Sequence, residues 1–217
     1  ALEGRGDHGV GDWGAAFLGV EDEAGATAAA KALASLGGAS HVKALARVAG
    51  GSGVRAEAAL ESVSRIPGGE IDDELIKLLR DPDKATINAA EKCLAKRQVR
   101  SAVPVLLELA KGKDKTIQRE LWKALLLLAD ETHLPALIGL LRDDEGDERL
   151  RDVVAGIARR STNRAATAAL FLNAHDGAKG NFKFALLPLL AISGGSQELA
   201  AVAAALKDGD PEAALSA

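Results

Sequence analysis

Residues 103–130 read VPVLLELAKGKDKTIQRELWKALLLLAD, which is two apolar runs separated by a short charged loop. Apolar residues recur at helical spacing in both runs, at Val103, Leu106, Leu107 and Ala110 and then at Ile117, Leu121, Ala124, Leu125 and Leu128. The loop KGKDK supplies the glycine and the charges that a buried helix lacks. The stretch therefore predicts a helical hairpin, and its apolar stripes need neighbouring hairpins to cover them.

This hairpin recurs along the chain at intervals of about 30 to 33 residues. Aliphatic residues occupy the position of Leu106 in every copy, namely Leu45, Leu75, Leu106, Leu137, Leu170 and Val202. The position four residues later is small or aliphatic, namely Ala49, Leu79, Ala110, Leu141, Ala174 and Leu206. The following helix carries a further series, namely Leu60, Ala90, Leu121, Val153 or Val154, and Leu186. The period covers both helices of each hairpin, so the sequence predicts a stack whose repeated positions face inward.

The positions of the prolines agree with the helix boundaries that the repeat predicts. Pro104 and Pro135 each stand two residues before a repeated leucine, where a proline in the first helical turn costs no hydrogen bond. Asp-Pro pairs at 81–82 and 210–211 fall between predicted helices, where they favour a turn. Pro188 lies inside a predicted second helix and indicates local bending of the stack there, in preference to a binding cleft.

Two segments carry a family resemblance. AVPVLLELA at 102–110 and HLPALIGLLRD at 133–143, each followed by a loop and an alanine-rich helix, resemble bacterial HEAT-like repeats of the armadillo/HEAT superfamily. The resemblance extends over roughly residues 39–217. It implies an all-α fold, a right-handed α–α superhelix (solenoid) of about six to seven HEAT-like hairpins.

The chain departs from the family pattern in two respects. Its period is shorter than the roughly 40 to 47 residues of the eukaryotic form. The frequent Asp-x-x-Val-Arg opening of second helices survives only as Gly53-Val54-Arg55. Ankyrin and tetratricopeptide repeats have nearby periods, but neither a Thr-Pro-Leu-His string nor the Trp-Leu-Gly-Tyr spacing occurs.

The domain organisation follows from the repeat. Residues 1–11, with four glycines, are expected to be a flexible leader or linker. Residues 12–217 are expected to form a single HEAT-like repeat domain. Its hairpins are expected at 12–38, 39–68, 69–99, 100–130, 131–162, 163–195 and, truncated, 196–217. A stack that stops within a hairpin suggests a piece of a larger polypeptide.

Composition restricts the class of protein. The chain has 217 residues, is 47% hydrophobic and 3% aromatic, lacks Tyr and Met, and carries a net charge of −4. Abundant Ala and Leu with few aromatic residues favour closely packed helices over sheets. No apolar run is long enough to span a membrane. The protein is expected to be soluble and cytoplasmic, although export stays open because the sequence does not begin with Met.

No residue pattern predicts catalysis, a metal or a cofactor. His41 and His133 could form a metal pair, but both stand four residues before a repeated leucine and belong to different hairpins, so helix-start roles are expected. The single cysteine, Cys93, is expected to be a buried small hydrophobe. The acidic run at 143–148 lacks the glycine and glutamate of a calcium-binding loop. Phosphate-loop, hydrolase and zinc-protease motifs do not occur.

One surface feature is not required by the repeat. Arg119 and Lys123 lie opposite the inward stripe of their helix, and equivalent positions hold Asn88 and Lys92 in the preceding hairpin and Arg151 in the next. By the resemblance, second helices line the concave side of the stack. We call this set the basic ridge: Asn88, Lys92, Arg119, Lys123 and Arg151. Trp122 lies beside it, either exposed as an interface residue or packed on the neighbouring second helix.

The expected function is a non-catalytic interaction or scaffolding module that binds another protein or an acidic peptide on its concave face through the basic ridge and Trp122. The protein is expected to be a monomer without nucleic-acid or membrane partners. The alternatives are an ancillary domain that positions an attached enzyme, or a divergent HEAT-like lyase or DNA glycosylase. An acidic, tyrosine-free chain matches poorly the basic, aromatic-lined groove that the resemblance implies for such a glycosylase.

Overall fold

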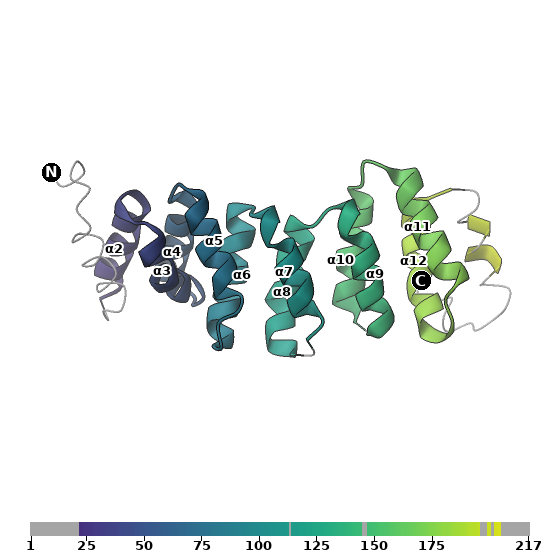
Figure 1. The fold of residues 1–217 in the computed structure, drawn as a ribbon, viewed down its shortest axis with the longest axis horizontal. Helices are drawn as coiled ribbons and strands as arrows, with labels where there is room; N and C mark the ends of the chain where they lie inside the picture. Colours follow the sequence, from purple (N-terminus) through teal and green to yellow (C-terminus); the bar gives the residue numbers. More distant parts are fainter. Residues whose placement is uncertain (1–21, 113, 145–146, 196–198, 201, 205–217) are drawn as a thin grey trace. The chain divides into compact units, whose positions relative to one another are not determined.

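The computed structural model describes residues 22–112, 114–144, 147–195, 199–200 and 202–204. All regular secondary structure in these residues is helical, so the predicted all-α fold of repeated helices is confirmed (Figure 1). The principal helices are α2 (Glu23–Leu36), α3 (Val42–Ala49), α4 (Val54–Arg65), α5 (Gly69–Leu78), α6 (Lys84–Arg97), α7 (Val103–Ala110), α8 (Lys115–Leu128), α9 (Leu134–Asp143), α10 (Glu148–Arg159), α11 (Arg164–Asp176) and α12 (Gly180–Ser193). The predicted first helix, the second Asp-Pro pair and most of the truncated hairpin lie outside the described residues.

From α3 to α12 the helices follow one another in pairs, α3 with α4, α5 with α6, α7 with α8, α9 with α10, and α11 with α12. Short 3-10 turns at Ala39–His41, Arg100–Ala102 and Glu131–His133 lead into α3, α7 and α9. Pro104 and Pro135 lie in the first turns of α7 and α9, as predicted. Pro188 lies inside α12, which continues to Ser193. None of the helices in the described part of the chain is both long and apolar enough to cross a membrane.

Backbone contacts divide the chain into two compact units, residues 1–128 and 129–217. In the first unit the second helices form one layer, in which α2 packs on α4, α4 on α6, and α6 on α8. The first helices lie on the other side, where α3 contacts α5 and each first helix packs on its own second helix. In the second unit α9 packs on α10, α10 on α12, and α11 on α12. Whether residues 12–217 act as one domain stays a prediction.

The repeated positions form the core of the first unit, except that Leu60, which was expected to face inward, is only half-buried. Leu45, Leu75 and Leu106 are fully buried, and so is Leu121 in the second-helix series. Cys93 is buried in the same layer, and this desolvation raises the pKa of its thiol to about 12. Cys93 therefore contributes to packing as a small apolar residue, as predicted, because a thiol that stays protonated is a poor nucleophile.

In the second unit the repeated positions are buried in the first hairpin and at Leu186 of α12, but not in α11. Leu137 and Leu141 are fully buried. Leu170 and Ala174 of α11, which were expected to face inward, are only half-buried. The inward positions of α11 are Thr167, Ala168, Phe171 and His175. The helix presents this face because it holds Phe171, the bulkiest side chain of α11, and burying its ring removes the most apolar area from water.

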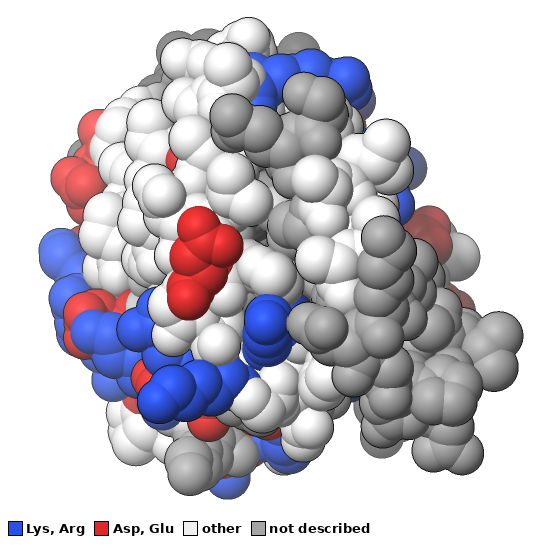
Figure 2. All heavy atoms as spheres, turned by 90° about the vertical axis from the view of Figure 1, so that its right-hand side faces the viewer, with Lys and Arg blue, Asp and Glu red and all other residues white. Residues whose placement is uncertain are grey.

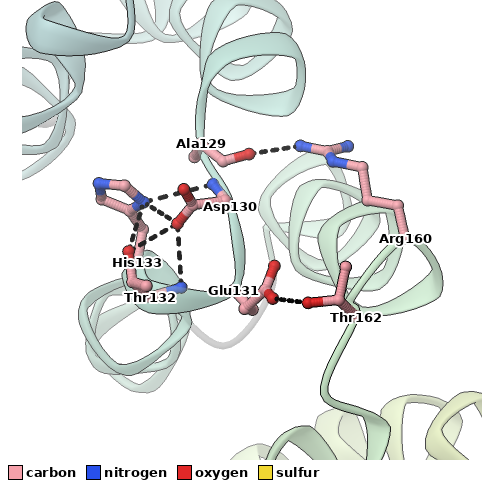
Figure 3. A network of polar contacts seen from close by, with 7 residues as sticks. All are labelled: Ala129, Asp130, Glu131, Thr132, His133, Arg160 and Thr162. Atoms are coloured by element: carbon pink, nitrogen blue, oxygen red, sulfur yellow. Dashed lines mark hydrogen bonds and ion pairs between the residues drawn. The ribbon is translucent and has the colours of Figure 1, made fainter.

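The histidines at the starts of first helices act as caps, as predicted. Nδ1 of His41 accepts a hydrogen bond from the backbone N–H of Gly38 at 3.1 Å. Nδ1 of His133 lies 3.3 Å from the backbone nitrogen of Asp130 and 2.9 Å from the carboxylate of the same residue (Figure 3). Each ring lies against a backbone N–H group at the start of the 3-10 turn that would otherwise lack a hydrogen-bond partner. Each histidine therefore has a capping role at the start of its helix.

Arginines at the ends of second helices join consecutive hairpins. The guanidinium of Arg97, at the end of α6, donates to the carbonyls of Val63 and Ile66 at the end of α4, at 2.6 and 2.8 Å. Its Nε also pairs with Asp72 of α5 at 2.6 Å. In the second unit Arg160 donates to the carbonyl of Ala129 at 2.6 Å (Figure 3). In the first unit a cation therefore satisfies the carbonyls that α4 leaves open at its end.

Charge is sparse on the last described hairpin. Residues 164–195 contain only four Lys, Arg, Asp or Glu residues, namely Arg164, Asp176, Lys179 and Lys183. In Figure 2, where the right-hand side of Figure 1 faces the viewer, most of the described surface is uncharged, and Lys and Arg lie at the lower left, at the top and at the right. Within the hairpin His175 is buried, and desolvation, together with nearby Lys183, lowers the pKa of its imidazole. His175 is therefore a neutral core residue at neutral pH.

Candidate partner-binding groove

An open groove of about 700 Å³ lies in the first unit, on the N-terminal halves of α6 and α8. The end of α3 and the turn that follows it form its third side. We call it the α6–α8 groove. It is lined by Arg47, Gly50, Gly51, Asp83, Ala85, Thr86, Asn88, Lys92, Lys115, Thr116, Arg119 and Glu120.

Four cationic side chains converge on this groove from three helices. Arg47 comes from α3, Lys92 from α6, and Lys115 and Arg119 from α8. Arg47 and Arg119 are exposed, and neither makes a side-chain hydrogen bond or ion pair with the residues that the structure describes. Lys92 is half-buried, and its ammonium donates to the carbonyl of Gly50 at 3.2 Å. The two arginines are therefore available to an anionic ligand.

The two carboxylates of the groove already have partners. Asp83 caps α6 by accepting from the backbone nitrogens of Ala85 and Thr86, each at 3.2 Å, and from the Thr86 hydroxyl at 2.7 Å. These bonds, with nearby Arg47, hold the pKa of Asp83 below its ordinary value. Glu120 pairs with Lys123 at 2.8 Å. The balance of unpaired charge in the groove is thus positive.

A glycine lets α3 and α6 approach each other at the floor of the groove. A Cβ atom placed on Gly50 would lie 2.8 Å from the Cβ atom of Ala89, which is closer than carbon atoms pack. The same close approach brings the carbonyl of Gly50 within reach of Lys92. We infer that a side chain at Gly50 would separate α3 from α6 and alter the shape of the groove.

A second, smaller pocket of about 370 Å³ lies further along α6 and α8 and is also bounded by α4. Its apolar lining consists of Leu60, Ala95, Ala124 and Leu127. Lys92 and Glu120 line both cavities, so the two are neighbours on the second-helix layer. Glu91 also lines this pocket, which we therefore call the Glu91 pocket.

The structure brings together only part of the basic ridge. Asn88, Lys92 and Arg119 line the α6–α8 groove, and Lys123 lines the Glu91 pocket. Arg151 belongs to the second unit, where it lies 3.8 Å from Glu148 in a partly exposed ion pair. Whether these residues bind a partner stays a prediction.

Trp122 is not an exposed interface residue. Its side chain is buried, at 4% exposure, in α8. The exposed alternative was therefore wrong, because Trp122 lies next to the inward stripe of α8 and an indole is large enough to reach the helix interface from there. Burial of Trp122 removes it from the candidate binding surface and assigns it to the core.

Sequence reasoning missed several charged contributors to these cavities, among them Arg47, Lys115 and Glu91. Arg47 lies at the end of a first helix, whereas the periodicity was applied only to exposed positions of second helices. Glu91 lies on the second-helix interface, at a place where its neighbours in sequence are Ala90 and Lys92. A charged residue one position after a repeated alanine was a signal that could have identified Glu91 as unusual.

Among the described residues, no group of three or more His, Cys, Asp and Glu side chains is arranged to hold a metal ion. The histidines at helix starts are occupied with capping, and the carboxylates of the groove with a helix cap and an ion pair. The chemistry that the α6–α8 groove offers is therefore charge and hydrogen bonding.

Comparisons with known proteins concern the repeat and the fold. Residues 73–158 match the family model for HEAT repeats. A comparison with curated proteins gives no match. Of the solved structures, the complex of CpcE and CpcF of phycocyanin lyase from a Nostoc species is 19% identical, with a TM-score of 0.45, over 83% of this chain and 75% of that chain. An engineered protein is 20% identical, with a TM-score of 0.43, over 92% of this chain and 95% of that chain.

Proposed function

We propose, from the premise that the chain is a HEAT-like helical repeat protein, that it is a non-catalytic interaction module whose α6–α8 groove binds an acidic segment of a partner protein. Such repeats present a preformed surface and pay little ordering cost on binding. The mechanism is capture of aspartate or glutamate side chains by the cations of the groove.

The convergence of Arg47, Lys92, Lys115 and Arg119 on one groove is the observation that supports this proposal. Exposed arginines form bidentate hydrogen bonds with carboxylates, which adds geometric selectivity to charge attraction. Asn88 contributes a buried amide oxygen without a hydrogen-bond partner among the described residues. Because that oxygen is closed to solvent, the amide group must turn toward the groove before it can accept a hydrogen bond from the backbone N–H of an extended partner segment.

An acidic protein segment fits the groove better than a nucleic acid does. The chain as a whole carries a net charge of −4, which opposes a polyanion beyond the immediate groove. None of the described residues that line the groove is aromatic, so there is no platform on which a base could stack. A short acidic peptide needs only the local positive charge of the groove.

The proposal predicts charge-dependent peptide binding by the full chain. The probe is a short fluorescent peptide of alternating glutamate and serine, titrated at low salt and followed by fluorescence anisotropy. Combined Arg47→Glu and Arg119→Glu substitution is expected to weaken binding by at least about tenfold, because two attractive contacts become repulsive. Binding to the unmodified chain is expected to weaken as salt rises, because the groove is open to solvent.

The matched control makes the same change of net charge elsewhere. Lys31 and Arg80 are exposed and lie outside the groove, so combined Lys31→Glu and Arg80→Glu substitution should leave peptide affinity nearly unchanged. Equal losses in the two double variants would show that only overall charge matters and would contradict the proposed site. Tighter binding of duplex DNA than of the acidic peptide would contradict the proposed partner.

A further inference from the structure

Glu91 is the most unusual side chain of the first unit. It is fully buried, at 0% exposure, and lies in the middle of α6. Neither carboxyl oxygen has a hydrogen-bond partner among the described residues. Buried polar groups in proteins are nearly always hydrogen-bonded, so a carboxyl group with two unused oxygens calls for an explanation beyond packing.

The surroundings of Glu91 are largely apolar. Leu60 of α4, Ala95 of α6, and Ala124 and Leu127 of α8 line the pocket with it. Leu127 is 55% exposed, which is rare for a leucine on a packed helix layer. An apolar wall with an exposed leucine favours a ligand that has a short hydrocarbon stem.

The charged groups around the pocket are already paired. The ammonium of Lys92 donates to the Gly50 carbonyl, Lys96 pairs with Glu61 at 3.4 Å, and Lys123 pairs with Glu120. Desolvation raises the pKa of Glu91 to about 8, with a further contribution from the charge of Glu120. The carboxyl group is therefore neutral at pH 7 and offers one hydrogen-bond donor and one acceptor.

We propose that the Glu91 pocket binds a neutral carboxamide, the side chain of a glutamine in the partner segment that occupies the neighbouring α6–α8 groove. A carboxamide carries an N–H donor and a carbonyl acceptor side by side, so it pairs with a neutral carboxyl group through two hydrogen bonds. Its methylene stem contacts the apolar walls. The assignment to the partner segment rests on the proposed function, whereas the chemistry of the pocket does not.

Charged ligands fit this pocket less well. A carboxylate or an ammonium group would lose its hydration against an apolar wall and face a neutral carboxyl group. The three lysines lining the pocket already have acceptors, so a ligand carboxylate would have to break one of those contacts. Because both Glu91 oxygens are closed to solvent, the ligand must also push aside a lining side chain, and exposed Leu127 is the least constrained.

Small-molecule probes test the pocket without the partner. Butyramide, butyrate and butylammonium share a stem and differ in the charge of the head group. Each is titrated into the full chain at pH 7 while the methyl NMR signals of Ala124 and Leu127 are followed. Butyramide is expected to bind about tenfold more tightly than either charged probe, which corresponds to one net hydrogen-bonded contact.

Two variants identify the group that recognises the amide. Glu91→Gln keeps one donor and one acceptor and should retain butyramide binding within about threefold. Glu91→Leu should weaken butyramide binding about tenfold, because both hydrogen bonds are lost. Tightest binding of butylammonium, equal binding of all three probes, or no methyl shift with butyramide would overturn the proposal. If the unmodified chain binds butyramide but not the acidic peptide, the proposed function is wrong and the assignment of the Glu91 pocket to a carboxamide is retained.

Discussion

Replacing Glu91 by leucine is expected to stabilise the protein by about 3 kcal/mol at pH 7. The unfolded carboxyl group ionises above about pH 4.5, whereas the folded one keeps its proton up to about pH 8. Folding between these values requires proton uptake, which costs about 1.4 kcal/mol per pH unit. Leucine has one heavy atom fewer and no proton to take up, and the adjoining pocket gives room for the branch at its Cγ atom.

The pH dependence has a definite sign. Since the folded pKa of Glu91 lies above the unfolded value, the stability of the unmodified chain is expected to be greatest below pH 4.5 as far as this group is concerned, and to fall as pH rises towards 8. The advantage of the Glu91→Leu variant should therefore grow with pH across this window. Urea unfolding followed by circular dichroism at several pH values measures both effects.

The control for this prediction is an exposed glutamate on a neighbouring helix. Glu108 of α7 is 71% exposed, so Glu108→Leu should leave the free energy of unfolding and its pH dependence nearly unchanged. A Glu91→Leu variant no more stable than the unmodified chain at pH 8 would mean that the buried carboxyl group is compensated, and the account of an unpartnered Glu91 would be wrong.

Replacing Arg97 by alanine is expected to destabilise the first unit by about 3 kcal/mol. The Arg97 side chain is only 10% exposed, and its guanidinium satisfies the carbonyls of Val63 and Ile66 and pairs with Asp72. Alanine removes all of these contacts and leaves two carbonyls at the end of α4 without partners in a largely buried place. Thermal and urea unfolding measure the loss.

Arg65 provides the comparison for Arg97. It also lies at the end of a second helix, but its side chain is 69% exposed and, among the described residues, pairs only with Glu61 of its own helix. Arg65→Ala should therefore change stability little, because exposed pairs at this spacing contribute weakly. Similar losses for the two alanine variants would show that helix-end charge, and not the link between hairpins, stabilises this layer.

The sequence repeat predicted the helical fold. It failed to predict the inward face of a helix where one bulky side chain outweighed the repeated aliphatic positions. Leu45, Leu75 and Leu106 are buried as the period required, since equivalent positions of equivalent hairpins meet the same neighbours. In α11 the period pointed to Leu170, but Phe171 takes the inward position. The inward positions were assigned from the spacing of aliphatic residues, and that spacing takes no account of the larger apolar area of an aromatic ring.

The candidate site was only partly predictable for a different reason. Arg119 and Lys92 were found because the repeat places them on equivalent outward faces of successive second helices, which spacing alone reveals. Arg47 approaches the same groove from α3, a first helix, and the spacing of outward positions in second helices carries no information on that approach. The burial of Glu91 depends on how closely α4, α6 and α8 pack, which only the structure provides.

Backbone NMR of the full chain, titrated with the glutamate and serine peptide, tests the central claim most directly. The account predicts that the largest shifts cluster in the turn after α3 and in the first halves of α6 and α8, at Gly50, Gly51, Thr86, Asn88 and Thr116, all of which line the groove. Shifts that spread evenly over exposed lysines and arginines of the first unit, or that lie outside these three segments, would contradict it.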